Sequence, residues 1–106
     1  MRDLIEDIYN ELALDNWQLT ERSFSKEYLG RCGSYMAYLK SSDRQPSADA
    51  VLHLWGKLNQ QKTIAEHQLP KARHPLNQHN LEASIERYAT LCERAFRALN
   101  AIAMKQ

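Results

Sequence analysis

The 106-residue sequence contains little glycine, proline or cysteine, and it has no long apolar run. Three Gly and three Pro leave few places for tight turns, and β-branched runs are rare, which favours helices over strands. Two cysteines are too few for a disulfide framework, so we expect two reduced thiols. No apolar run approaches the roughly 20 residues that span a bilayer, and the acid-rich N-terminus is unlike a signal peptide. The sequence therefore predicts an all-α protein of the cytoplasm, not of the membrane.

The sequence also lacks the short motifs that carry common catalytic chemistry. It has no Gly-rich phosphate loop, no serine elbow and no His-Glu-x-x-His pattern, so we expect neither an enzyme nor a cofactor. His67, His74 and His79 would need a Cys-x-x-Cys pair or a similar anchor to form a zinc site with Cys92, and none is present. We therefore expect no metal site and interpret these histidines as solvated or partly packed loop residues.

Apolar residues make up 43 % of the chain and charged residues 25 %, which is enough for one domain with its own core. The net charge of +1 hides an uneven distribution. Residues 1–19 carry one basic side chain against five acids, whereas residues 20–62 carry seven against four. Residues 63–106 carry six against four. The positive middle segment is compatible with a nucleic-acid surface.

Apolar periodicity and capping residues predict five helices, at about residues 3–14, 21–29, 33–41, 48–60 and 81–104. Thr20, Ser47 and Asn80 are the expected N-caps, and Gly30 stands where a helix end favours positive φ. Residues 63–80 contain two prolines and no periodic apolar pattern, so we expect an extended connector there.

The short helices expected at residues 21–29 and 33–41 are separated by a glycine turn, which is the helix-turn-helix arrangement. The turn and the second helix lie within the string LGRCGSYMAYLKSSDRQPS. Spacing within the second helix places Tyr35 and Leu39 on its core side and Tyr38 and Lys40 outside. The conspicuous pieces are Leu19-Thr20, Leu29-Gly30, Ser34-Tyr35-Met36, Leu39-Lys40 and Arg44-x-Pro46-Ser47. In these pieces and their spacing, about residues 4–60 resemble the lambda-repressor-like (Cro/C1-type) helix-turn-helix family.

The resemblance implies a four- to five-helix domain at residues 1–62, followed by the connector at 63–80 and a C-terminal helix at 81–106, all in one compact unit. It implies a dimeric transcriptional regulator that reads double-stranded DNA by placing residues 33–41 in the major groove. Side chains that would face base edges are Ser34, Ala37 and Tyr38. Side chains that would hold phosphates are Arg22, Arg31 and Lys40, with Arg44 at a phosphate or in the minor groove.

The sequence departs from the family pattern in two places. The interval from Ser25 to Leu29 is one residue longer than usual, which changes the helix face by about 100°. Cys32 and Gly33 stand where a reading helix usually begins with polar side chains, and Gly33 has no side chain to contact a base. The alternative is therefore a non-catalytic interaction module with a protein partner, built on a scaffold that no longer reads DNA.

The C-terminal helix carries apolar residues at alternating intervals of four and three, which is the spacing of a heptad seam. The seam consists of Leu81, Ile85, Tyr88, Cys92, Ala95, Leu99 and Ile102, and it is widened by Leu91 and Phe96. Such a helix either folds back over the domain or pairs with its copy in a second chain. We expect a homodimer formed through this helix.

Overall fold

A computed structural model of the protein describes residues 2–42 and 46–105. The described elements are α1 (Arg2–Asp15), α2 (Glu21–Glu27), α3 (Tyr35–Ser42), α4 (Ala48–Gln68), the 3-10 turn η1 (Leu69–Lys71) and α5 (Pro75–Lys105). These residues include no strand, and the predicted all-α class is confirmed. None of the described helices combines the length and the apolar character of a bilayer-crossing segment.

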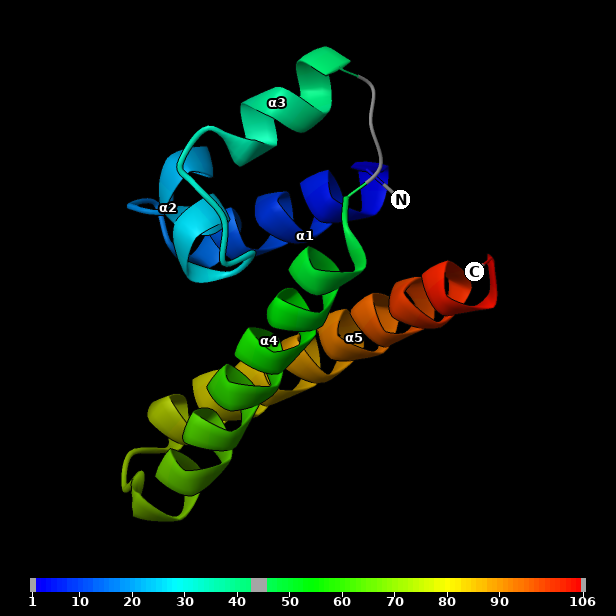
Figure 1. Ribbon diagram of the computed structural model, residues 1–106. Coiled ribbons are helices and arrows are strands. Elements are labelled where there is room, and N and C mark those ends of the chain that lie inside the picture. Colours follow the sequence, from blue (N-terminus) through cyan, green and yellow to red (C-terminus); the bar gives the residue numbers. More distant parts are fainter. Residues whose placement is uncertain (1, 43–45, 106) are drawn as a thin grey trace.

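The helices form two groups (Figure 1). Helices α4 and α5 make a long antiparallel hairpin, and α1, α2 and α3 gather beside the half of this hairpin that contains the start of α4. The molecule is accordingly elongated, with extents of 47 × 30 × 18 Å. The far end of the hairpin, around η1, projects away from the first three helices.

Two helix starts are fixed by the capping residues that the sequence predicts. The Thr20 hydroxyl accepts a hydrogen bond from the Ser23 N–H at 3.1 Å, and the Ser23 hydroxyl oxygen accepts one from the Thr20 N–H at 3.0 Å. Ser47 caps α4 by accepting from the Ala50 N–H at 3.2 Å. Each cap satisfies backbone donors that the first helical turn leaves without partners.

One hydrophobic core joins both groups of helices. Phe24 is fully buried, and its ring centroid lies 5.4 Å from that of Tyr9 and 5.3 Å from that of Tyr28. The buried residues of this core are Ile5, Ile8, Leu12, Leu19, Phe24, Leu29, Met36, Ala50, Val51, Leu54, Leu58, Leu91, Cys92, Ala95 and Ala98. The apolar stripes predicted for α1 and α4 are therefore the faces that α1 and α4 bury.

The segment 63–80 differs from the predicted extended connector, because only residues 69–74 lie between α4 and α5 and three of these form η1. Helix α4 continues to Gln68 although Ala65 is its only buried residue beyond Leu58 among those described, so no apolar stripe reveals it. Pro70 lies at the start of η1 and Pro75 at the start of α5, where a missing N–H breaks no hydrogen bond. Asn80 consequently lies inside α5 and is not its cap.

The predicted seam of α5 faces the chain's own core. Cys92 and Ala95 are buried against α1 and α4, and the other five seam residues are half-buried. Leu91 is also buried, whereas Phe96 is 47 % exposed and its ring centroid lies 6.2 Å from that of Trp55. Helix α5 thus takes the fold-back arrangement, and much of its apolar surface is used within the chain.

Candidate nucleic-acid interface

The segment between α2 and α3 is longer than the sequence predicts. Helix α2 ends at Glu27 and α3 begins at Tyr35, so seven residues connect them where the prediction allowed three. Gly30 has φ of +64°, as expected at this position. A Cβ atom there would also lie 2.7 Å from Cδ2 of His53 in α4, and His53 Nδ1 lies 3.0 Å from the Tyr28 carbonyl oxygen. Both the backbone conformation and the close histidine ring therefore require glycine.

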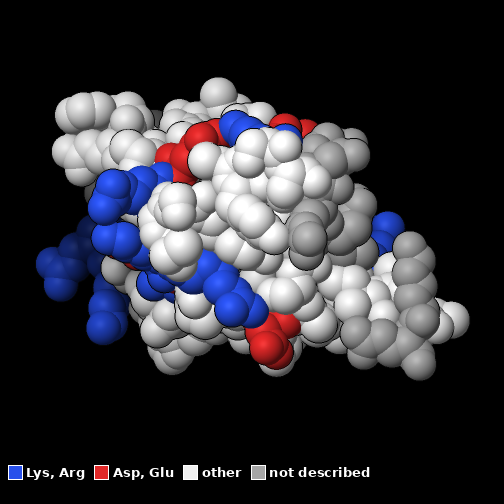
Figure 2. Space-filling view, turned by 45° about the horizontal axis from the view of Figure 1, so that its top comes forward, with Lys and Arg blue, Asp and Glu red and all other residues white. Residues whose placement is uncertain are grey.

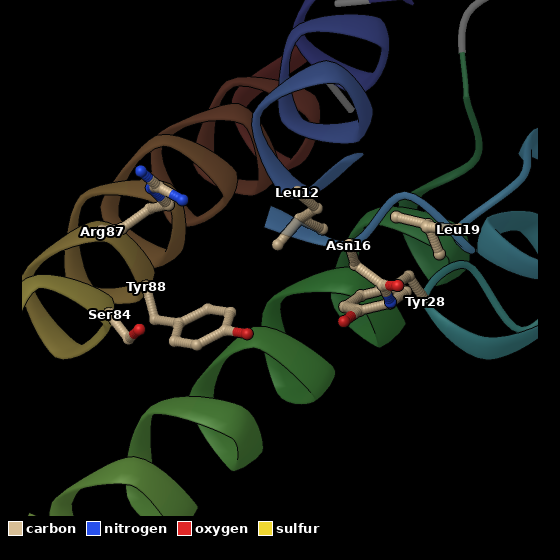
Figure 3. A pocket seen from close by; sticks show the side chains of 7 residues that line it. All are labelled: Leu12, Asn16, Leu19, Tyr28, Ser84, Arg87 and Tyr88. Carbon is tan, nitrogen blue, oxygen red and sulfur yellow. The ribbon is translucent and has the colours of Figure 1, made fainter. Parts of the chain in front are cut away.

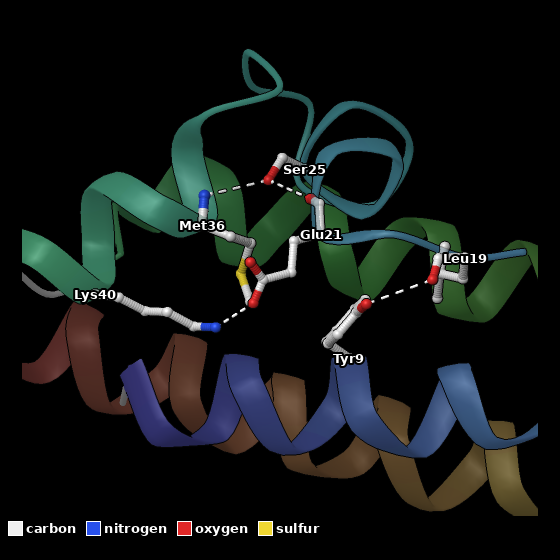
Figure 4. Close-up of polar contacts among 6 residues, drawn as sticks. All are labelled: Tyr9, Leu19, Glu21, Ser25, Met36 and Lys40. Carbon is white, nitrogen blue, oxygen red and sulfur yellow. Dashed lines mark hydrogen bonds and ion pairs between the residues drawn. The ribbon is translucent and has the colours of Figure 1, made fainter. Parts of the chain in front are cut away.

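Ser25 ties the two helices of this unit together (Figure 4). Its side chain is fully buried, and its hydroxyl donates to the Glu21 carbonyl at 2.8 Å and accepts from the Met36 N–H at 3.2 Å. The Ser25 carbonyl accepts from the Arg31 N–H at 2.9 Å. One residue of α2 thus anchors the turn and the first turn of α3. Helix α2 is mostly polar, so a serine beside Phe24 gives no distinct sequence signal for this role.

The residues predicted to face bases share the exposed side of α3. Ser34 immediately precedes the helix, and its carbonyl accepts the Tyr38 N–H at 2.9 Å. Ser34, Ala37 and Tyr38 are all exposed, as their spacing of three and four residues requires for one helix face. Leu39 is buried and Tyr35 half-buried on the opposite side, so the predicted division of α3 is confirmed.

Gly33 is explained by the side chain that covers it. A Cβ atom at Gly33 would lie 2.6 Å from Cγ of Arg22, so the aliphatic part of Arg22 packs directly over the glycine. Gly33, which has no side chain to contact a base, therefore leaves the space in which Arg22, one of the predicted phosphate ligands, packs. Arg22 remains exposed.

The other predicted phosphate ligands make contacts within the chain. Arg31 Nη2 donates to the Ser47 hydroxyl at 2.8 Å, and its guanidinium lies 5.8 Å from the centroid of the Tyr35 ring. Lys40 forms an ion pair with Glu21, which raises the pKa of Lys40, so the lysine is charged at neutral pH (Figure 4). Exposed ion pairs contribute about 0–1 kcal/mol, so a phosphate can compete with Glu21 for Lys40. Arg44 lies outside the described residues.

The two cysteines occupy different environments. The Cys32 sulfur is exposed and lies 3.4 Å from the Ser34 hydroxyl oxygen. Hydrogen bonds from Ser34 lower the pKa of the Cys32 thiol, and nearby Arg31 acts in the same direction. Burial in the core raises the pKa of Cys92. The described residues bring together no group of three or more His, Cys, Asp or Glu side chains that could hold a metal ion.

The surface formed by α2, the following turn and α3 carries basic side chains on one side. Lys and Arg side chains gather toward the α2 end of this face, and the α3 side is mostly uncharged (Figure 2). Exposed basic residues of this surface are Arg22, Lys26, Arg31 and Lys40. Helix α5 packs against α4 and α1 and leaves the outer face of α3 uncovered (Figure 1).

Comparison with known protein families matches residues 5–105 to a family of unknown function, DUF6626. The chain belongs to the DUF6626 family. No curated protein and no solved structure matches it. The DUF6626 match covers α1–α3 as well as the α4–α5 hairpin, so both groups of helices belong to what the family shares.

Proposed function

We propose that this protein is a lambda-repressor-like DNA-binding transcriptional regulator of the cytoplasm, with α2 and α3 as its helix-turn-helix unit. The observation that carries the proposal is the uncovered outer face of α3, on which Ser34, Ala37 and Tyr38 lie together. Basic side chains border this face on the α2 side. A helix with an open polar face and basic flanks fits the major groove, where base edges are read and phosphates lie on both sides.

Different side chains of this surface would contribute to DNA affinity and to sequence specificity. The hydroxyls of Ser34 and Tyr38 can donate to or accept from base edges, and the Ala37 methyl can contact a thymine methyl. Arg22, Arg31 and Lys40 would neutralise phosphates. Because Gly33 adds no base contact, we expect most of the binding free energy to come from phosphates and the preference for one sequence to be modest.

The proposed mode of action is a homodimer. Readers of this kind bind two half-sites about 34 Å apart, and the two-fold symmetry of the protein matches that of the site. Since the seam of α5 is largely used within the chain, the second copy would contact residues that remain exposed on the hairpin. Phe96 and Leu52, which are 47 % and 50 % exposed, are the large apolar side chains available near Trp55.

The test is fluorescence anisotropy with a random duplex and with DNA from upstream of the gene, at two salt concentrations. Three phosphate contacts per copy, or six in the dimer, predict a slope of about −5.4 in log K against log salt. This slope corresponds to about an 1,800-fold loss of affinity between 50 and 200 mM salt. The variant Arg22→Gln removes one contact from each copy and should reduce the magnitude of this slope by about 2. Lys71→Gln is the matched control, because it removes one charge from the exposed far end of the hairpin.

Two results would contradict the proposal. One is the absence of binding tighter than about 1 mM at low salt. The other is an equal response of the two variants, which would mean that binding depends on net charge and not on the face of α3.

A second candidate function is a protein-interaction module, favoured by the contacts that Arg31 and Lys40 already make. Arg31 is held by Ser47 and Lys40 by Glu21, so neither side chain extends freely toward a duplex. Trp17 is 86 % exposed and offers an apolar anchor for a protein partner. If Arg22→Gln and Lys40→Gln left the function in the cell unchanged while Trp17→Ala abolished it, this second function would replace the first.

A further inference from the structure

Gly33 directly precedes the exposed face of α3, and the reason for a glycine at this position is steric. Its backbone lies outside the left-handed region, unlike that of Gly30, so no turn conformation requires it. A Cβ atom at Gly33 would lie 2.6 Å from Cγ of Arg22, 3.1 Å from its Nε and 3.3 Å from its Cδ. The Arg22 side chain of α2 therefore occupies the space in which a side chain at position 33 would stand.

The start of α3 is the end at which a reading helix brings its side chains to base edges. The guanidinium group of Arg22 begins at Nε, 3.1 Å from the place that a Gly33 Cβ would take. Arg22 thus carries five N–H donors to the start of α3, beside Ser34. A side chain of α2 stands where the sequence of α3 provides none.

Contacts between α2 and α3 hold Arg22 in place relative to the reading helix (Figure 4). Arg22 lies in the first turn of α2, and reciprocal hydrogen bonds between Thr20 and Ser23 fix the start of that turn. The Ser25 hydroxyl accepts the Met36 N–H at 3.2 Å and joins α2 to the first turn of α3. Because the backbone is fixed and the side-chain stem is packed, less side-chain entropy remains to be lost on binding.

The place of Arg22 favours a base edge over a phosphate as its partner. Phosphates border the major groove, whereas base edges form its floor and face the first turn of the reading helix. Guanine presents O6 and N7 there as two neighbouring acceptors, and an arginine can donate to both. None of the predicted base-facing residues, Ser34, Ala37 and Tyr38, carries two such donors. Among these side chains at the start of α3, only Arg22 can make this contact.

We propose that Arg22 reads one guanine in each half-site by donating to O6 and N7. This inference rests on the proposed DNA binding and changes the partner of Arg22 from a phosphate to a base. The positive charge lies close to the phosphates of both strands in either role, so the expected salt dependence is the same. The sequence preference changes, because Arg22 supplies it at one base pair in each half-site.

A cavity between the first group of helices and α5 offers no alternative place for a base (Figure 3). Its volume is about 120 Å³, and its described lining, which includes Tyr28 and Tyr88, contains no residue of α3. A cavity of about 150 Å³ accepts benzene, and guanine is larger than benzene. We therefore expect the guanine to be read within the stacked duplex and not flipped out of it.

The experiment begins with selection of bound duplexes from a random-sequence pool by the full chain, which should yield a fixed guanine in each half-site. Fluorescence anisotropy then compares the selected duplex with one that carries 7-deazaguanine at these positions. This base pairs normally with cytosine and lacks only the N7 acceptor. We expect the chain to bind the 7-deazaguanine duplex at least about fivefold more weakly.

Three variants test whether Arg22 is the source of this preference. Arg22→Ala should bind the two duplexes with equal affinity. Gly33→Ala should also lose most of the preference although it keeps every charge, because its Cβ displaces Cγ of Arg22. Lys26→Ala is the matched control, since it removes an exposed charge one turn further along α2, and it should keep the preference. If circular dichroism shows that Gly33→Ala unfolds the chain, Arg22→Ala still decides.

Failure of guanine reading can be distinguished from failure of DNA binding. If no duplex is bound more tightly than about 1 mM at low salt, both are contradicted. Binding without a fixed guanine, or with equal affinity for guanine and 7-deazaguanine, would overturn guanine reading and leave DNA binding intact. A preference that persists in Arg22→Ala, or that Lys26→Ala reduces equally, would overturn the assignment to Arg22.

Discussion

Ser25 supports the α2–α3 unit through one buried hydroxyl, and its removal isolates the effect of that contact. The variant Ser25→Ala leaves the buried Met36 N–H without its acceptor. An unsatisfied buried donor costs about 1–3 kcal/mol, so we expect the free energy of unfolding to fall by that amount. Urea denaturation followed by circular dichroism measures it, with Ser41→Ala, an exposed serine of α3, as the control. Equal midpoints for the two variants would show that Ser25 does not hold α3.

Gly30 combines two separate requirements, a positive φ and space for His53. The variant Gly30→Ala should lower the free energy of unfolding by about 1–2 kcal/mol for the left-handed conformation, and further because its Cβ meets the His53 ring. In a His53→Ala background the second contribution should disappear, and the first should remain. Denaturation of the single and double variants separates the two as a coupling free energy.

The matched control for this experiment is Gly56→Ala. Gly56 lies inside α4, and a Cβ atom there would have no neighbour within 4 Å. Alanine should therefore stabilise the helix by about 0.5–1 kcal/mol. Destabilisation by both glycine substitutions, with no coupling to His53, would contradict the explanation given for Gly30.

Among the helices, those with a clear apolar stripe or cap could be predicted from the sequence. The Thr20 and Ser47 caps and the buried face of α1 follow from local chemistry. The continuation of α4 to Gln68 could not be predicted, because Ala65 alone is buried there. Two prolines indicated a break, yet both lie where helical turns begin. Local patterns thus predict the helices that pack on the core and fail where a helix is mainly solvated.

The same contrast predicts a gradient of stability along α5. Residues 75–80 are all exposed, and this end of the helix is supported by hydrogen bonds such as that from the Leu76 N–H to His74 Nδ1. Leu91, Ala95 and Ala98 are buried in the core. We expect amide hydrogen exchange to be at least about a hundredfold faster at residues 78–80 than at residues 91–98. Equal protection would mean that something outside the chain covers the first turns of α5.

At the scale of the whole molecule, the sequence predicts which side of α3 is exposed but not the cavity or the path of α5. The exposed face follows from spacing within one helix, as Ser34, Ala37 and Tyr38 illustrate. The cavity depends on Tyr28 and Tyr88 approaching from helices sixty residues apart, and no local pattern contains that information. The seam of α5 allowed both packing within the chain and pairing between chains, since the two arrangements bury the same apolar stripe.

Fold-back of α5 changes where a second copy could bind, because much of the seam already packs within the chain. With Cys92 and Ala95 buried, the proposed dimer would use the exposed apolar side chains near Trp55. Sedimentation velocity should detect a species of twice 12.3 kDa, and Phe96→Glu should weaken its association at least about tenfold. Leu76→Glu adds the same charge to an exposed apolar site near the far end of the hairpin and should have no effect. A monomer at all concentrations, or equal effects of both variants, would contradict a dimer formed on this face.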